Sequence, residues 1–178
     1  MAGAQGEERS AALTFANTLR VGPSGPDDDL SDNAKASIWL RQHDYKPGLL
    51  FGTSDLKRLV ELRSAIQELL TARADKKVAG RQAVDRVNRE AAADPVAPKL
   101  TWKRTVPTQE PVRNSGTNAI AAALARDAID VVTGELGGLL HPCGAEDCTQ
   151  FYVRDHGRRQ WCSTTCGDRV RQRRRTHS

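Results

Sequence analysis

All four cysteines of this 178-residue chain lie in its last 36 residues, as two close pairs divided by a spacer. The first pair is Cys143 and Cys148, and the second is Cys162 and Cys166. Two such pairs can meet around one tetrahedral Zn²⁺, since each supplies two thiolates from a short stretch of backbone. Two disulfides would instead need an oxidising compartment. Residues 1–19 show no apolar run of signal-peptide length, which favours a reducing cytosol and therefore zinc.

The predicted metal site is structural rather than catalytic. Four thiolates leave no open coordination position for water, and sulfur-rich ligation makes zinc a weak Lewis acid. The rest of the chain offers no phosphate-binding glycine loop, no nucleophile motif and no histidine pair at helical spacing. We therefore expect one structural Zn²⁺ and a protein that is not an enzyme.

The composition favours a mainly helical fold. Aromatic residues make up 4% of the chain, so its core must depend on Leu, Ile, Val and Ala, which suit helices better than a β-sandwich. No apolar stretch reaches the ~20 residues that cross a bilayer, so we expect a soluble, cytoplasmic protein without a membrane partner. Apolar periodicity and capping residues predict helices over 10–20, from Ser31 or Asp32 to Leu40, and over 54–74, 80–92 and 118–135.

The remaining segments complete a mainly α fold with a short β hairpin or strand region. Residues 22–33 are rich in turn formers, and residues 99–112 are predicted to be extended and divided by Pro107. We expect two domains, a helical domain over 1–140 and a small zinc finger over 141–178. Since the sequence GGLLHP alone joins them, the finger should be docked rather than flexibly tethered.

The predicted order of elements in the finger is that of a treble clef. Residues 143–148 form a knuckle, residues 151–155 and 158–162 are predicted to form two paired strands, and a helix follows. Ser163, Thr164 or Thr165 is expected to cap that helix. Residues 141–178 hold eight arginines and four acidic residues, a net charge of +4 out of +5 for the chain. Four thiolates and one Zn²⁺ would lower the charge of this region to +2.

A basic cluster follows the last cysteine, made of Arg169, Arg171, Arg173, Arg174 and Arg175. Clustered arginines are typical of a surface that contacts phosphates, although a solvated C-terminal helix explains the same run equally well.

Two stretches resemble known families. The segment WCSTTCGDR (161–169) resembles the signature of the CGNR zinc-finger family. LTFANTL (13–19), the pair Trp39-Leu40 and LRSAI (62–66) look like the helical ABATE domain that precedes this finger. Members are regarded as stress-related bacterial transcription regulators, so the resemblance implies a DNA-binding finger behind a sensor domain. Asp168 stands where the family has Asn, and we expect it to brace Arg169 or cap the helix rather than face DNA.

On this interpretation the partner is double-stranded DNA, with the five clustered arginines on phosphates and Arg158 and Arg159 adding backbone contacts. A finger this small makes limited contact, so useful affinity would need a homodimer or a second surface. One alternative is a zinc-stabilised adaptor that docks on another protein. Another is an RNA-binding protein in which Tyr152 and Trp161 stack on bases.

Arg63 is the unusual residue of the helix predicted over 54–74, because it falls on the apolar face. A guanidinium in that place must pair with an anion or extend to water. We expect an internal ion pair, with Asp127 as the partner. The alternative is a pocket for a small acidic ligand, lined by Arg63 together with Asn17, Thr18 and Trp39.

Overall fold

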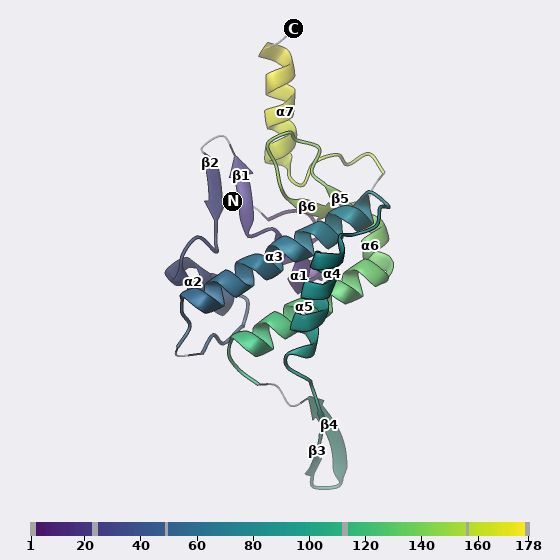
Figure 1. Cartoon of the computed structure of the whole chain (residues 1–178). Coiled ribbons are helices and arrows are strands. Elements are labelled where there is room, and N and C mark those ends of the chain that lie inside the picture. Colours follow the sequence, from purple (N-terminus) through teal and green to yellow (C-terminus); the bar gives the residue numbers. More distant parts are fainter. Residues whose placement is uncertain (1–2, 23–24, 49, 112–113, 156, 177–178) are drawn as a thin grey trace.

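The structure, a computed structural model, describes residues 3–22, 25–48, 50–111, 114–155 and 157–176. Its helices are η1 (Glu7–Arg9), α1 (Ala11–Ala16), α2 (Asn33–Gln42), α3 (Thr53–Ala74), α4 (Arg81–Ala92), α5 (Thr117–Thr133), α6 (Glu135–Leu139) and α7 (Thr164–Thr176). Its strands are β1 (Leu19–Gly22), β2 (Gly25–Asp28), β3 (Pro98–Lys103), β4 (Val106–Pro111), β5 (Leu140–Pro142) and β6 (Phe151–Val153). Each strand pairs with its neighbour in the chain to form an antiparallel two-stranded sheet (Figure 1). The predicted mainly α fold with short strand pairs is confirmed.

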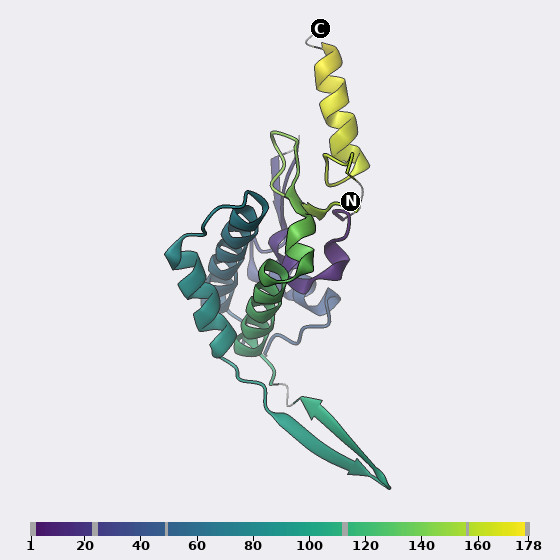
Figure 2. The same cartoon turned by 90° about the vertical axis from the view of Figure 1, so that its right-hand side faces the viewer.

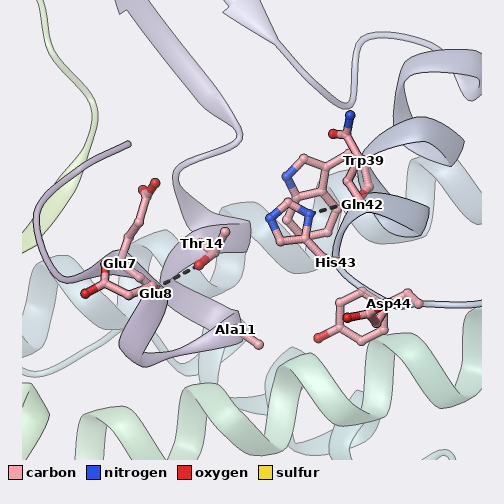
Figure 3. A pocket seen from close by; sticks show the side chains of 9 residues that line it. Glu7, Glu8, Ala11, Thr14, Trp39, Gln42, His43 and Asp44 are labelled. Atoms are coloured by element: carbon pink, nitrogen blue, oxygen red, sulfur yellow. Dashed lines mark hydrogen bonds between the residues drawn. The ribbon is translucent and has the colours of Figure 1, made fainter. Parts of the chain in front are cut away.

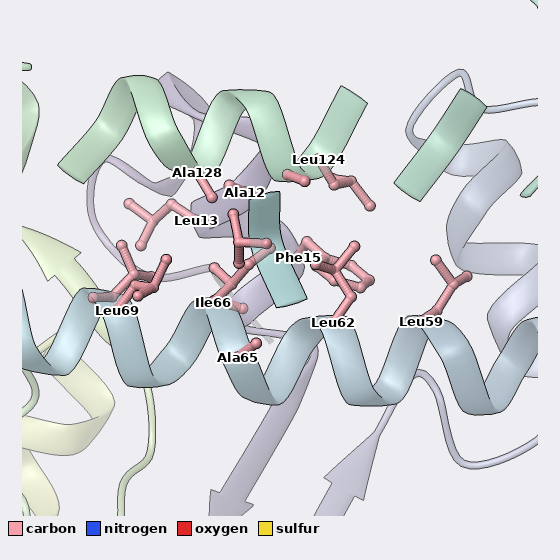
Figure 4. Close-up of a cluster of buried hydrophobic side chains, with 14 of the residues drawn as sticks. Ala12, Leu13, Phe15, Leu59, Leu62, Ala65, Ile66, Leu69, Leu124 and Ala128 are labelled. Atoms are coloured by element: carbon pink, nitrogen blue, oxygen red, sulfur yellow. The ribbon is translucent and has the colours of Figure 1, made fainter. Parts of the chain in front are cut away.

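The core of the helical body lies between α3 and α5, with α1 packed beside them (Figure 4). Leu62 and Ile66 of α3 are fully buried, and so are Leu124 of α5 and Phe15 of α1. These side chains recur at three- and four-residue intervals, so each helix presents one apolar stripe to the others. α4 covers the outer side of α3 and α5 and completes the body.

The helix predicted over 10–20 is shorter in the structure. Ser10 caps α1 as expected, with its Oγ accepting a hydrogen bond from the N–H of Leu13 at 3.1 Å. α1 ends at Ala16, and Leu19 begins β1, which pairs with β2 across the segment expected to be only turns. The cause is tertiary, because the side chain of Asn17, the residue that ends α1 as its C-cap, bonds the backbone of Phe151 in β6. Of the two proposed caps for α2, Asp32 has this role.

Strands β3 and β4 form a hairpin that projects from the helical body (Figures 1 and 2). The predicted division at Pro107 is wrong. The turn lies at residues 104–105, where Arg104 has a φ of 56°, and Pro107 lies in β4 opposite Trp102. A two-stranded sheet has only edge strands, and an edge tolerates proline because one side of each strand makes no ladder bonds.

The predicted strand pair of the finger is also wrong. β6 pairs with β5 around the knuckle, and residues 158–162 form no strand. The other side of β6 is occupied by the N-terminal segment, since the N–H of Val153 donates to the carbonyl of Gln5 at 2.9 Å. The N–H of Gln5 in turn donates to the carbonyl of Cys162 at 3.0 Å. Residues before the first helix therefore take the place that the second strand was expected to fill; residue 156 lies outside the described residues.

The finger and the β3–β4 hairpin lie at opposite ends of the molecule (Figures 1 and 2). The body is between them, and α7 extends away from it. Within the described residues, no helix has the length and apolar character to cross a membrane.

Candidate metal centre and basic helix

The fold brings all four cysteines together. Cys143 and Cys148 lie at the two ends of the knuckle between β5 and β6, Cys162 precedes α7, and Cys166 lies in the first turn of that helix. Their Sγ atoms all lie within 4.8 Å of one another. Ser163 fixes the start of α7, because its Oγ accepts a hydrogen bond from the N–H of Cys166 at 3.3 Å.

The distances between the sulfur atoms match a tetrahedral zinc site. The Sγ of Cys162 lies 3.7 Å from that of Cys148 and 3.5 Å from that of Cys166, and Cys148 and Cys166 are 3.8 Å apart. Zn–S bonds of about 2.3 Å in a tetrahedron place sulfur atoms about 3.8 Å apart, whereas a disulfide needs about 2.05 Å. The cysteines are free thiols, and the cluster fits one structural Zn²⁺.

The ionisation of these thiols is coupled, because each lies beside the others. Hydrogen bonds from Cys148 and Cys162 lower the pKa of the Cys143 thiol. The Cys143 sulfur, as acceptor of those bonds, raises the pKa of Cys148 and of Cys162, and burial adds to the effect. Four thiolates this close repel one another, so the fully ionised set needs a divalent cation among them.

Arg169 lies beside the cysteine cluster. Its guanidinium donates from Nη2 to the Sγ of Cys166 at 3.6 Å and is paired with Asp147 of the knuckle at 2.8 Å. The side chain of Arg169 is only 15% exposed. A half-buried arginine that neutralises an electron-rich sulfur cluster supports the metal site, as groups around metal ligands commonly do. Contact of Arg169 with a DNA phosphate stays a prediction. The geometry does not favour it, because the guanidinium already bonds Cys166 and Asp147.

Asp168 has a different partner from the one expected. It pairs with Arg171, three residues further along α7, at 2.6 Å, while Arg169 pairs with Asp147. Asp168 and Arg171 are both more than half exposed, and the Arg171 guanidinium also lies 5.6 Å from the centre of the Trp161 ring. The prediction that Asp168 braces Arg169 or caps the helix is wrong, because Asp168 pairs with Arg171 and the side chain of Ser163 bonds the first turn of α7. The residue that Asp168 contacts belongs to the exposed basic surface.

The rest of the basic cluster lies on the part of α7 that extends from the body (Figure 2). Arg171, Arg173, Arg174 and Arg175 are exposed, and Arg173 reaches Asp147 at 2.9 Å. Arg158 is exposed and Arg159 half-buried in the loop that precedes Cys162.

Tyr152 is unsuited to stacking on bases. Its side chain is 1% exposed, and its hydroxyl donates to the carbonyl of Arg159 at 2.8 Å. Tyr152 packs inside the finger, against the cysteines, so the RNA interpretation loses one of its two aromatic residues.

Arg63 forms the expected internal ion pair, but its partner is Asp28 rather than the predicted Asp127. Its Nη2 donates to Asp28 at 2.9 Å, and its Nη1 contacts Asp28 and donates to the hydroxyl of Thr18 at 3.0 Å. Asp127 instead accepts from the N–H of Ala12 at 2.7 Å and from the hydroxyl of Ser10. Burial alone would raise the pKa of Asp28, but hydrogen bonds from Arg63 and the N–H of Leu30 outweigh it and hold the pKa below its ordinary value.

Two family models match the chain. Residues 9–135 match the ABATE family, whose description is "Putative stress-induced transcription regulator". The chain belongs to this family. Residues 140–177 match the CGNR zinc finger, so the resemblance read from WCSTTCGDR is confirmed, and neither family is one of enzymes. A comparison with curated proteins gave no significant match.

The four residues proposed as a ligand pocket do not all share one cavity. Asn17 and Trp39 together line a cavity of about 310 Å³, but neither Thr18 nor Arg63 contributes to it. Trp39 also lines a cavity of about 450 Å³ between η1–α1 and the end of α2 (Figure 3). Three carboxylates line this cavity, those of Glu7, Glu8 and Asp44, so it repels an acidic ligand. Thr18 is buried against Arg63, which lies among the core residues of α3. The predicted acidic ligand therefore has no support at this position.

Asn17 links the ABATE domain to the finger, a role that the sequence did not reveal. Its Nδ2 donates at 2.9 Å to Glu7 and at 2.9 Å to the carbonyl of Phe151, and its Oδ1 accepts from the N–H of Phe151 at 2.8 Å. Asn17 is 2% exposed, so both ends of its amide are satisfied inside the protein. The sequence placed Asn17 inside the helix predicted over 10–20 and so gave no signal of this role.

Proposed function

We propose that this chain is a zinc-dependent DNA-binding transcription regulator. Residues 141–178 form the finger, with Cys143, Cys148, Cys162 and Cys166 as the metal ligands, and residues 1–140 form the sensor or partner domain. A bound Zn²⁺ supplies a four-way cross-link between the knuckle and the start of α7. The observation that carries the proposal is the exposed basic helix beginning at the cysteine cluster, in a chain whose family is described as transcription regulators.

The arginines of this helix divide into two roles. Arg169 neutralises the cluster, and its pairing with Asp147 ties α7 to the knuckle. Arg171, Arg173, Arg174 and Arg175 provide the phosphate contacts, because their side chains are exposed along the extended part of α7. Arg158 and Arg159 add contacts from the loop at the same end of the molecule.

A salt titration of DNA binding tests the proposal. Arg173, Arg174 and Arg175 are changed together to Ala in the zinc-loaded chain, and binding to a short duplex is followed by fluorescence anisotropy at several salt concentrations. We expect weaker binding to every duplex sequence and a slope of log K against log salt reduced by up to about three, since each lost phosphate contact releases about one counterion fewer.

The matched control removes the same charge elsewhere. Arg41, Arg81 and Arg89 are exposed on α2 and α4, and changing them to Ala should leave the slope within error of the unmodified chain. Equal DNA binding by a chain that ends at Val170 contradicts the proposal.

A second candidate function is a protein-interaction adaptor, which the β3–β4 hairpin favours. Leu100 and Trp102 lie on one face of that hairpin and are 66% and 65% exposed. Exposed apolar side chains on a projecting hairpin are typical of contact surfaces. The two functions are compatible, because the hairpin and α7 lie at opposite ends of the molecule.

A further inference from the structure

A second cavity, of about 350 Å³, lies between the C-terminal half of α3, α4 and the C-terminal half of α5. Leu69, Val87, Ile129 and Val132 contribute apolar walls. Leu69 and Val87 are buried in the main core, so these walls are held in place by packing. The volume is at the small end of the ~300–1,000 Å³ of small-molecule sites, which are mostly apolar with a few placed polar groups.

The charged residues that line this cavity are both cations, Arg73 and Lys77. Arg73 is half-buried and donates from Nε to the carbonyl of Val132 at 3.0 Å. Lys77 is exposed and pairs with Asp75 at 2.9 Å. An apolar interior with two cations and no carboxylate in its lining selects a ligand with an apolar body and one negative end. The cavity beside Trp39, lined by three carboxylates, has the opposite preference.

Arg73 also connects the cavity to the start of the finger. Val132, whose carbonyl it holds, lies just before the break between α5 and α6. Gly137 of α6 packs on the same guanidinium, since a Cβ added there would lie 3.0 Å from the Nε of Arg73. α6 runs directly into β5 and Cys143. An anion that attracts this guanidinium therefore acts on the corner that leads to the first cysteine.

We propose that this cavity binds a small monocarboxylate with an apolar body, with the carboxylate at Arg73 and Lys77 and the body among the α3, α4 and α5 side chains. Charge-assisted hydrogen bonds to a guanidinium are stronger than neutral ones and fix the orientation of the ligand. The binding site stands on the cavity alone, whereas its regulatory meaning rests on the proposed function.

Isothermal titration calorimetry on the full, zinc-loaded chain tests the proposal. The probes are the straight-chain carboxylates from butanoate to decanoate, benzoate, and the alcohols of the same chain lengths. We expect saturable binding of one carboxylate per chain, strengthening with chain length until the cavity is filled. The alcohol of the same length should bind about tenfold more weakly.

Three variants separate the parts of the site. Arg73→Gln should weaken the best carboxylate about tenfold and leave the alcohol unchanged. Ala72→Phe fills the cavity and should abolish binding of both. Arg81→Gln is the matched control on α4, with a side chain 93% exposed and outside the cavity, and should bind as the unmodified chain does.

Zinc content and melting temperature are measured on each variant, and Lys77→Gln replaces Arg73→Gln if the latter does not fold. Absence of saturable binding by every carboxylate overturns the proposal, and so does equal binding of carboxylate and alcohol. The best carboxylate is then added to the duplex-binding assay. Carboxylate binding without DNA binding in either state contradicts the proposed function and leaves the site supported, so the two failures are distinguishable.

Discussion

The finger and the β3–β4 hairpin are both small additions to the helical body, but they are held differently. The finger is joined by buried side-chain hydrogen bonds of Asn17 and by backbone hydrogen bonds of Gln5. The hairpin keeps Leu100 and Trp102 mostly exposed, and a two-stranded sheet alone is marginally stable in water. A short connection therefore fixes the position of a small module only when residues outside the connection bond to it.

The β1–β2 hairpin is an intermediate case. It too is a two-stranded sheet, but Asp28 at its end forms the ion pair with Arg63 inside the body. This largely buried ion pair therefore anchors the hairpin to the body, as several hydrogen bonds anchor the finger. β3–β4 shows no comparable anchor among the described residues.

The largest expected effect comes from Cys162→Ser. We expect zinc content to fall from one per chain to near zero, because a finger without its metal loses the free energy that folds it. Hydrogen exchange should then speed up over 140–176 and at residues 4–7, which bond the finger, while α3 and α5 stay protected by their own core. Native mass spectrometry and hydrogen exchange measure the two effects.

Thr165→Ser, an exposed change in the first turn of α7, is the control for this variant and should retain zinc. Retention of one zinc by Cys162→Ser, or equal loss of protection in α3 and α5, contradicts the prediction.

Asp28→Asn tests the anchor of the β1–β2 hairpin and should cost up to about 3 kcal/mol at pH 7, since it leaves the Arg63 charge buried without its partner. Because the folded pKa of Asp28 lies below its ordinary value, the pair stabilises fully above that ordinary value, near 3.8, and the contribution is lost as pH falls through the folded pKa. The variant should therefore flatten the loss of stability below about pH 4, measured by urea unfolding.

Asp27→Asn is the matched control, because Asp27 is half exposed and pairs with the surface residue Arg20. It should change stability by less than about 1 kcal/mol. An equal cost for both variants would show that Arg63 is not the anchor.

Gly6→Ala probes the N-terminal segment that holds the finger. Gly6 has a φ of +75°, and a Cβ there would lie 2.7 Å from the Cβ of Val153 in β6. Gly25 also has a positive φ, +95°, but its Cβ would meet nothing within 4 Å, so Gly25→Ala measures the backbone strain alone. We expect Gly6→Ala to cost about 1–3 kcal/mol more than Gly25→Ala in thermal unfolding, from the overpacking against β6. Equal costs would mean that the contact is not tight.

Much of the helical body could be predicted from the sequence, because it follows from local signals. Neighbouring residues alone determine the apolar period of α3 and α5, and also the caps at Ser10 and Asp32. The cysteine cluster was also predictable, because close pairs of thiols restrict the possible geometry.

The wrong predictions concern contacts between residues that are distant in the chain. Nothing near Arg63 reveals that Asp28, rather than Asp127, is its partner. The position of Gln5 beside β6, which displaces the expected second strand, depends on a separation of about 150 residues. Sequence patterns give the face of an element but not which element covers it.

The smallest expected effect concerns the hairpin itself. Changing Leu100 and Trp102 together to Thr places β-branched residues, which suit a strand, at both positions and removes its apolar face. Since both side chains are exposed, we expect the free energy of unfolding to change by less than about 0.5 kcal/mol. In contrast, Leu62→Thr in the body removes a fully buried leucine and should cost at least about 3 kcal/mol. Urea unfolding of the three proteins, with light scattering over a range of concentrations, measures stability and association together. A cost above about 2 kcal/mol for the hairpin variant at every concentration would show that this face packs on its own body. A cost that appears only where the unmodified chain associates would instead show that the exposed face is covered by a second copy.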